Sequence, residues 1–259
     1  EKEGNKKELS TTYNNIGLVY YKLKDFEKAL SYFKRSNAAM NEANDKSNLD
    51  RCLANIGLCY SELGDFDKAV AYFEDAIELC DDSCSDDLII ECYHGLGIVN
   101  QRSGKYEAAK DKYLISYERA NKVKNKRFIA ENLIALNELS FLQEDYPACI
   151  KYLSEAESVL RNSEFNEIQI IVYSEFSKVY KAVSDFQKAT LYQTKYIELK
   201  DSVYNGEFIR NLARVQTNYE ERENIPIIAA KEKALERQRR LNVAIVIIAV
   251  LAALLIFVL

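Results

Sequence analysis

The residues of this chain most able to carry chemistry are its six cysteines and its single histidine, His94. Cys80 and Cys84 are separated by three residues, and they are the one pair whose spacing suggests a disulfide bond. A metal site would need two such pairs or several nearby histidines, so we expect neither a metal nor another cofactor. Cys149 takes the place of alanine in a repeated pattern, which indicates a buried structural thiol.

Motifs of enzyme chemistry do not accompany these residues. The sequence contains no glycine-rich phosphate loop, no zinc-binding helix motif and no nucleophile elbow. A histidine kinase would need a phospho-accepting histidine in its own helical motif, and His94 lies inside a repeat. We therefore expect that the chain as given is not an enzyme, although a kinase output could follow residue 259. A net charge of −5 also gives no basic field for binding nucleic acid.

The elements that position these residues recur every 40 residues. One position of the repeat is occupied in turn by Gly17, Gly57, Gly97, Asn137 and Ser177. An aromatic residue recurs at the same interval of 40 residues, as Phe26, Phe66, Tyr106, Tyr146 and Phe186. With only 2 prolines and 8 glycines, the chain can form long helices. A fixed period of this length indicates a stacked array of helical units.

Each unit has the pattern of two helices joined by a short polar turn. In the first unit Tyr13 and Tyr20 follow helical spacing before the turn, and Phe26, Ala29 and Phe33 do so after it. Four of the five turns end in Asp, whose carboxylate can accept from free N–H groups at the start of the second helix. The glycines of the first helices would allow a neighbouring helix to pack closely.

The motif aromatic-x2-Ile/Leu-Gly-x2-Tyr followed by Ala-x3-Phe resembles the tetratricopeptide repeat. The resemblance covers about residues 5–200 and implies an all-α, right-handed superhelix of five repeats, at about 10–49, 50–89, 90–129, 130–169 and 170–205. Asn137 and Ser177 replace glycine, and Gln193 replaces the aromatic residue, so we expect repeats four and five to stack less tightly. Residues 1–9 align with the link at 41–49, which suggests a truncated upstream unit.

The resemblance also implies that the first helices line a concave face that binds a peptide or protein. In peptide-binding members of the family, the sixth position of the first helix often carries an asparagine that holds a peptide backbone, because an amide both donates and accepts. Here that position is Asn15 and Asn55, followed by Gly95, Ala135 and Glu175. The alternative is that both amides bond within the stack or to water.

Further candidates for ligand binding share this face by their place in the repeat. They are Arg51, Glu91, His94, Glu131 and Lys178. For each of them, plain solvated surface is the alternative. His94 could make ligand binding depend on pH, because an imidazole titrates near neutrality.

The residues after the repeats have a different pattern. A short heptad pattern at Phe208, Leu212, Val215 and Tyr219 predicts a helical stalk over 206–240, broken near Pro226, that could form a homodimer through 206–224. Residues 241–259 carry no charge. As a helix of ~1.5 Å per residue they would span roughly 28 Å, close to the ~30 Å hydrocarbon core of a bilayer. We therefore predict a transmembrane helix.

The whole layout resembles the sensor half of membrane regulators from Bacteroidetes-type bacteria. The resemblance is carried by the repeats, the LKDSVYN junction at 199–205, the charged RVQTNYEERE segment at 214–223 and the apolar end. In that family a histidine kinase or a helix-turn-helix output follows the membrane helix. The resemblance implies a periplasmic, ligand-binding input domain of a two-component system in the inner membrane. The alternative is a tail-anchored cytosolic adaptor, which the five Lys and Arg residues between 231 and 240 favour by charge.

Overall fold

A computed structural model describes residues 2–80, 85–206 and a few positions between 209 and 239, with side chains from residue 6 onward. The chain divides into two units, Glu1–Leu199 and Lys200–Leu259. All regular structure in the described residues is helical, without strands. None of the described helices is long and apolar enough to cross a membrane. The predicted transmembrane helix at 241–259 and the four residues of the heptad pattern lie outside the described residues.

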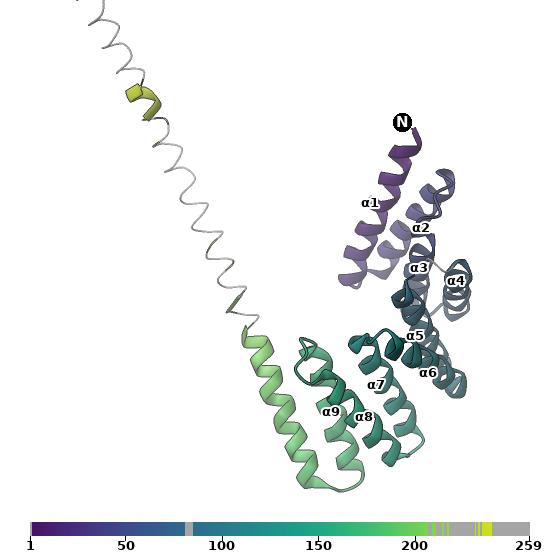
Figure 1. The fold of residues 1–259 in the computed structure, drawn as a ribbon, viewed down its shortest axis with the longest axis vertical. Coiled ribbons are helices and arrows are strands. Elements are labelled where there is room, and N and C mark those ends of the chain that lie inside the picture. Colours follow the sequence, from purple (N-terminus) through teal and green to yellow (C-terminus); the bar gives the residue numbers. More distant parts are fainter. Residues whose placement is uncertain are drawn as a thin grey trace, which may run out of the picture. The chain divides into compact units, whose positions relative to one another are not determined.

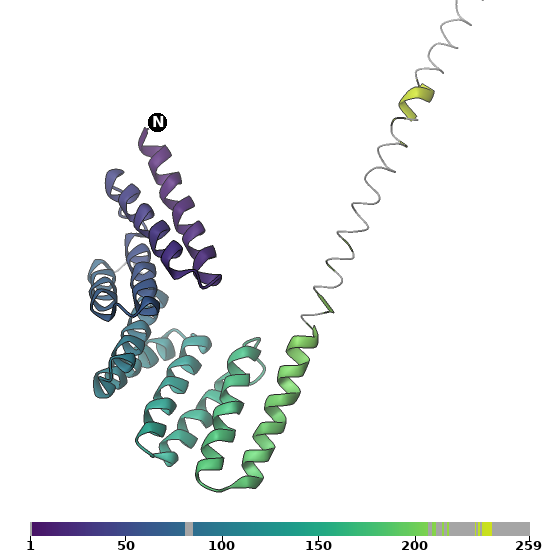
Figure 2. The same cartoon turned by 180° about the vertical axis from the view of Figure 1, so that it is seen from behind.

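The first unit is a succession of antiparallel helix pairs. Its labelled helices are α1 (Lys2–Lys22), α2 (Phe26–Glu42), α3 (Leu49–Leu63), α4 (Phe66–Leu79), α5 (Asp86–Arg102), α6 (Tyr106–Lys122), α7 (Lys126–Leu142), α8 (Tyr146–Leu160) and α9 (Asn166–Ala182). A further helix covers 186–206, of which 186–199 belongs to this unit. The pairs follow one another along a curved row (Figures 1 and 2), which confirms the all-helical superhelical fold.

One boundary differs from the sequence expectation. Residues 2–9 are part of α1 rather than a link like that at 41–49. In the later link the chain turns at Asn44 and Asn48, which both have a positive φ. Residues 2–9 contain no such turn, and lysine and glutamate favour a continued helix.

Close packing inside the first three repeats depends on glycine. A Cβ added to Gly17 would lie 2.6 Å from the Phe33 ring, and one added to Gly97 would lie 2.4 Å from the Tyr113 ring. Phe33 and Tyr113 are both buried in the second helix of the same repeat. The predicted close approach of the two helices is therefore confirmed, and the contacting group is an aromatic ring sixteen residues after each glycine.

In repeat four the residue at the glycine position is larger and the residue at the ring position is smaller. Asn137 stands in place of glycine, and Leu153, sixteen residues later, stands in place of the ring. Both side chains are completely buried, so the expected loosening is absent from this pair. The exchange has one cost, because Asn137 Oδ1 is the one buried side-chain N or O atom among the described residues without a hydrogen-bond partner.

The polar turns cap the second helices as predicted in four repeats. The side chains of Asp25, Asp65, Asp145 and Asp185 accept from the backbone N–H three residues later, at 3.2, 3.5, 3.1 and 3.1 Å. Lys105 holds the equivalent place before α6 and makes no side-chain cap. The capping groups fix where each second helix begins, and hence how it faces the first.

Four cysteines are free and buried: Cys52, Cys59, Cys92 and Cys149. Burial raises the pKa of the Cys149 thiol to about 11 and that of Cys92 to about 12, so both stay protonated and unreactive near neutral pH. The structural role predicted for Cys149 is consistent with this burial. Cys80 is disulfide-bonded, and its predicted partner Cys84 lies outside the described residues.

Candidate functional site

A pocket of about 340 Å³ opens among the first helices of repeats three to five. Its residues come from α5, α7 and α9, with Tyr113 contributed by α6. The lining consists of His94, Ile98, Gln101, Arg102, Tyr113, Glu131, Ile134, Ala135, Glu138, Ile168 and Ile171. On each first helix successive lining residues are three or four positions apart, except for the adjacent pairs Gln101–Arg102 and Ile134–Ala135, so that each helix presents one face to the pocket.

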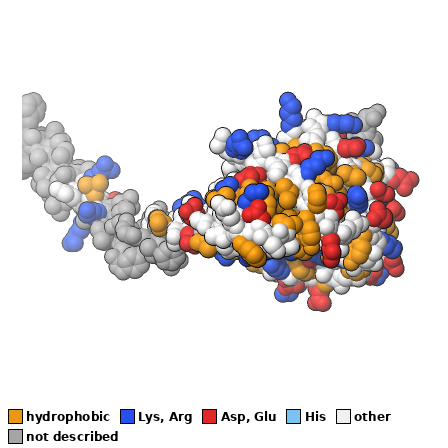
Figure 3. All heavy atoms as spheres, turned by 90° about the horizontal axis from the view of Figure 1, so that it is seen from below, with side chains coloured by type: hydrophobic (Ala, Val, Ile, Leu, Met, Phe, Trp, Pro, Cys, Tyr) orange, Lys and Arg blue, Asp and Glu red, His pale blue; other side chains and the backbone are white. Residues whose placement is uncertain are grey.

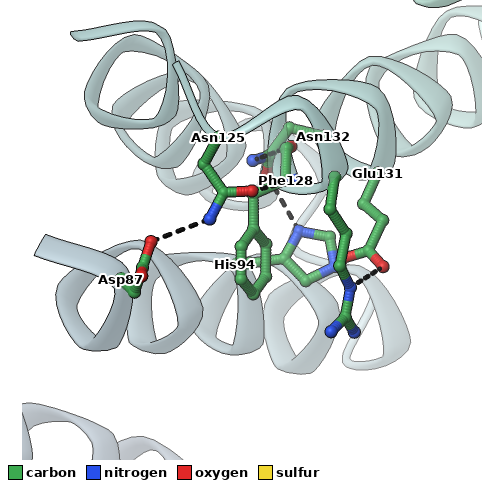
Figure 4. A network of polar contacts seen from close by, with 7 residues as sticks. Asp87, His94, Asn125, Phe128, Glu131 and Asn132 are labelled. Carbon is green, nitrogen blue, oxygen red and sulfur yellow. Dashed lines mark hydrogen bonds and ion pairs between the residues drawn. The ribbon is translucent and has the colours of Figure 1, made fainter. Parts of the chain in front are cut away.

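His94 is held from one side by a network of polar groups (Figure 4). Its Nδ1 lies 2.9 Å from Asn132 Oδ1. The Asn132 amide nitrogen donates to the Phe128 carbonyl at 2.7 Å and to the Ser116 hydroxyl at 2.8 Å. Since the amide nitrogen is used as a donor, its oxygen accepts, and the proton of His94 must sit on Nδ1. Nε2 is then left as a hydrogen-bond acceptor.

The surroundings of His94 keep its ring neutral. The ring lies 5.5 Å from the ring centre of Tyr113 and 5.8 Å from that of Phe128. Burial lowers the pKa of His94, more than the Asn132 hydrogen bond and the nearby Glu131 raise it. The imidazole is thus half-buried and bonded, where the sequence suggested an exposed side chain.

Most charged and polar groups of the pocket already have partners. Glu131 forms an ion pair with Arg127 at 2.9 Å. Arg102 donates to the Ser61 carbonyl at 3.0 Å and pairs with Glu62 at 3.2 Å. These partners hold the side chains in place before any ligand arrives.

Glu138 is held by an uncharged partner. Its Oε2 accepts from the Gln101 amide at 3.0 Å, and the amide oxygen of Gln101 accepts from the Tyr113 hydroxyl at 2.8 Å. Within the described residues no Lys or Arg forms an ion pair with Glu138. Glu138 is therefore a carboxylate of the pocket whose direct partner is uncharged.

Glu91 and Arg51 are not in the lining of the pocket, although Glu91 interacts electrostatically with Glu131, which is. Burial raises the pKa of Glu91, while the positive charges of Arg51 and Arg127 oppose that shift. Arg51 itself is exposed. Together with Glu131, these residues place mixed charges on the first helices of repeats two to four.

The remaining predicted residues lie elsewhere. Asn55 is buried, and its amide donates to Asn14 Oδ1 at 3.1 Å, so it bonds within the stack. Asn15 is exposed. Lys178 lies over the Phe141 ring at 4.3 Å and pairs with Glu175 at 3.4 Å.

The structure therefore brings two predicted residues, His94 and Glu131, into one pocket, and it adds Glu138 and a set of isoleucines. Glu138 could have been found from the sequence, because it stands 40 residues before Lys178 in the same column of the repeat. The isoleucines carry no such signal, since aliphatic residues at helical spacing are typical of any core.

Surface charge outside the pocket is mixed. On the face drawn in Figure 3, hydrophobic side chains gather among acidic and basic ones, and no extended basic field is visible. In the part of the chain that the structure describes, no group of three or more His, Cys, Asp or Glu could hold a metal ion.

Comparison with known proteins supports the repeat pattern. Residues 8–82 match the tetratricopeptide repeat family. No curated protein matches the chain.

Solved structures extend the likeness over most of the first unit. The structure is similar to BtubC (BKLC) from P. vanneervenii, with 18% identity over 77% of this chain and 82% of that chain, and a TM-score of 0.65. It is also similar to TPR-like repeats of a putative kinesin light chain from Podosopora anserina, with 10% identity over 77% and 98%, and a TM-score of 0.60. A Rap protein complexed with Competence and Sporulation Factor has 15% identity over 76% of this chain and 56% of that chain, with a TM-score of 0.64.

At these identities the likeness concerns the fold alone. Residues 8–82 therefore match the tetratricopeptide repeat family, and the helical repeats have the fold of TPR-like solved structures.

Proposed function

We propose that this chain is a non-enzymatic input domain that binds a peptide or protein segment in the pocket among α5, α7 and α9. The observation that carries the proposal is the pocket itself, whose polar side chains are already fixed by neighbours and whose wall is aliphatic. Such a site, apolar with a few placed polar groups, is typical of ligand-binding pockets. The Rap protein of similar fold was solved with a factor bound, which supports a binding role.

The proposal includes a place for the domain in a membrane-anchored signalling regulator. The uncharged stretch at 241–259 supports a membrane anchor. The disulfide bond of Cys80 supports an oxidising compartment, and hence periplasmic repeats.

The second candidate is a tail-anchored cytosolic adaptor that recruits partners to a membrane. It is favoured by the basic residues before 241, because cytoplasmic flanks are enriched in Lys and Arg. A reporter that works only in the cytoplasm and one that works only in the periplasm, each fused to the repeat end, distinguish the two. Activity of the cytoplasmic reporter alone would support the adaptor.

Selection from a random peptide display library on the full chain in detergent tests the binding role. Ile171 lines the pocket and is 47% exposed, so Ile171→Trp should fill the pocket without disturbing the core. Leu191 is similarly exposed at 53% but lies outside the pocket, and Leu191→Trp serves as the matched control.

We expect selected peptides to lose binding to the Ile171→Trp variant and to keep it with the Leu191→Trp variant. Selection of no peptide, or of peptides that bind all three proteins equally, would contradict binding in this pocket.

A further inference from the structure

The pocket contains hydrogen-bond acceptors that its own donors leave available. Arg102 donates to the Ser61 carbonyl and pairs with Glu62, and one N–H of the Gln101 amide donates to Glu138. By contrast, the Nε2 atom of His94 has no proton in the arrangement set by Asn132, and carboxylate oxygens accept only. A ligand that fits these groups must therefore supply donors.

The charges of the lining favour a ligand whose hydrogen-bond donor is positively charged. The charge of Arg102 is offset by Glu62, and that of Glu131 is offset by Arg127. Glu138 has the uncharged Gln101 as its partner, so among the described residues its carboxylate is the one in the lining without an ion pair. A half-buried carboxylate of this kind gains more from a cation than an exposed one does, because the surroundings screen less.

The pocket that holds these acceptors also has an aliphatic wall. Ile98, Ile134, Ile168 and Ile171 come from three different first helices and meet in the same pocket. The volume of about 340 Å³ suits one long side chain and a small apolar neighbour rather than a folded domain. The ligand should therefore combine a donor group with aliphatic carbon.

We infer that the pocket selects a peptide segment in which Lys or Arg lies beside an aliphatic residue, with the cationic group donating to Glu138. The aliphatic residue then covers the isoleucine wall, and His94 Nε2 accepts a second hydrogen bond from the cation or from the peptide backbone. The inference rests on the proposed function and specifies the chemistry of its ligand.

Fluorescence anisotropy with the full chain in detergent tests this chemistry. The probe is a fluorescein-labelled peptide Ile-Arg-Ile-Arg-Ile, and its comparison peptides carry citrulline or glutamate in place of arginine. Glu138→Gln keeps the shape of the side chain and an oxygen that can accept from Gln101. Glu107→Gln is the matched control, because Glu107 also accepts from a glutamine, Gln143 at 3.3 Å, and lies outside the pocket.

We expect the arginine peptide to bind about tenfold more weakly to Glu138→Gln than to the unchanged chain, as for loss of a hydrogen bond between charged groups. The Glu107→Gln variant should bind it within about twofold of the unchanged chain, since distant exposed charges contribute little. The citrulline and glutamate peptides should bind more weakly than the arginine peptide.

Equal affinity of Glu138→Gln and the unchanged chain, equal affinity for the citrulline peptide, or no binding of the arginine peptide would each overturn the inference. If display instead yields peptides without Lys or Arg that Ile171→Trp blocks, the binding role of the pocket stands and the cation preference fails. The two proposals can thus fail separately.

Discussion

Replacing Gly97 by alanine should destabilise the repeats, although alanine is the better helix former. The new Cβ would lie 2.4 Å from both Cδ1 and Cε1 of the Tyr113 ring. That ring is 1% exposed, and its hydroxyl is fixed by a 2.8 Å hydrogen bond to Gln101. The ring could move toward the pocket that it lines only by giving up this hydrogen bond and its packing in the core.

The size of the effect follows from two opposing contributions. Overpacking a well-filled core costs about 1–3 kcal/mol, and exchanging glycine for alanine inside a helix recovers about 1 kcal/mol. At so short a distance the cost should lie near its upper end, so we expect the free energy of unfolding to fall by about 2 kcal/mol. Urea unfolding of the full chain in detergent, followed by far-ultraviolet circular dichroism, measures this change.

Gly206 provides the control, because it lies in a helix and no heavy atom comes within 4 Å of a Cβ built on it. Gly206→Ala should therefore be neutral or slightly stabilising. If Gly97→Ala is as stable as Gly206→Ala, the argument from ring contact is refuted.

A second substitution separates ring contact from any other effect at Gly97. Tyr113→Leu copies the arrangement of repeat four, where Leu153 accompanies the larger residue Asn137. The double variant Gly97→Ala/Tyr113→Leu should lose less stability than the sum of the two single variants, because residues in contact are coupled. Simple additivity would show that the two positions do not interact.

Four further predictions concern other residues. Burial lowers the pKa of His94 in the folded chain, so below about pH 6.5 the unfolded chain binds more protons than the folded one. The free energy of unfolding should therefore decrease as the pH falls below that value. Urea unfolding at a series of pH values measures this decrease, and His94→Gln should remove it. Burial raises the pKa of Glu91, so the effect of pH on stability through this group is opposite to that of His94. Acidification should raise the free energy of unfolding through Glu91, and Glu91→Gln should remove this increase. In the same assay Asn15→Ala should leave the free energy of unfolding unchanged, and Asn55→Ala should lower it by about 1 kcal/mol. Weaker binding of a selected peptide to the Asn15→Ala variant would support the predicted contact of Asn15 with a ligand. Asn137→Ala should change stability by less than about 1 kcal/mol, since it removes both an unpaired buried oxygen and a hydrogen bond to Glu175; a large loss would contradict this balance.

The expected fold depended on periodicity, and periodicity is a local property. Residues 40 apart, such as Gly17 and Gly57, recur because the two helices of each pair pack together in the same way, with a ring sixteen residues after each glycine. The capping role of Asp145 could be predicted for the same reason, since an N-cap involves only the few residues that follow it.

The candidate site could be predicted only in part. The repeat frame places His94 and Glu131 on the first helices, which is enough to nominate them. It also nominated Asn55, whose amide turned out to bond to Asn14 of the preceding repeat. The frame identifies the face of a helix, but it does not identify which neighbour a side chain on that face will meet.

The sequence by itself determined the number and length of the helical units, because hydrophobic spacing, glycine positions and turn residues act within one unit. Only the tertiary structure decided that Glu138 has an uncharged hydrogen-bond partner and that isoleucines from α5, α7 and α9 line one pocket. These properties depend on which side chains of successive repeats come within a few ångströms of each other. That proximity is set by the angle between stacked helix pairs, which no single unit encodes.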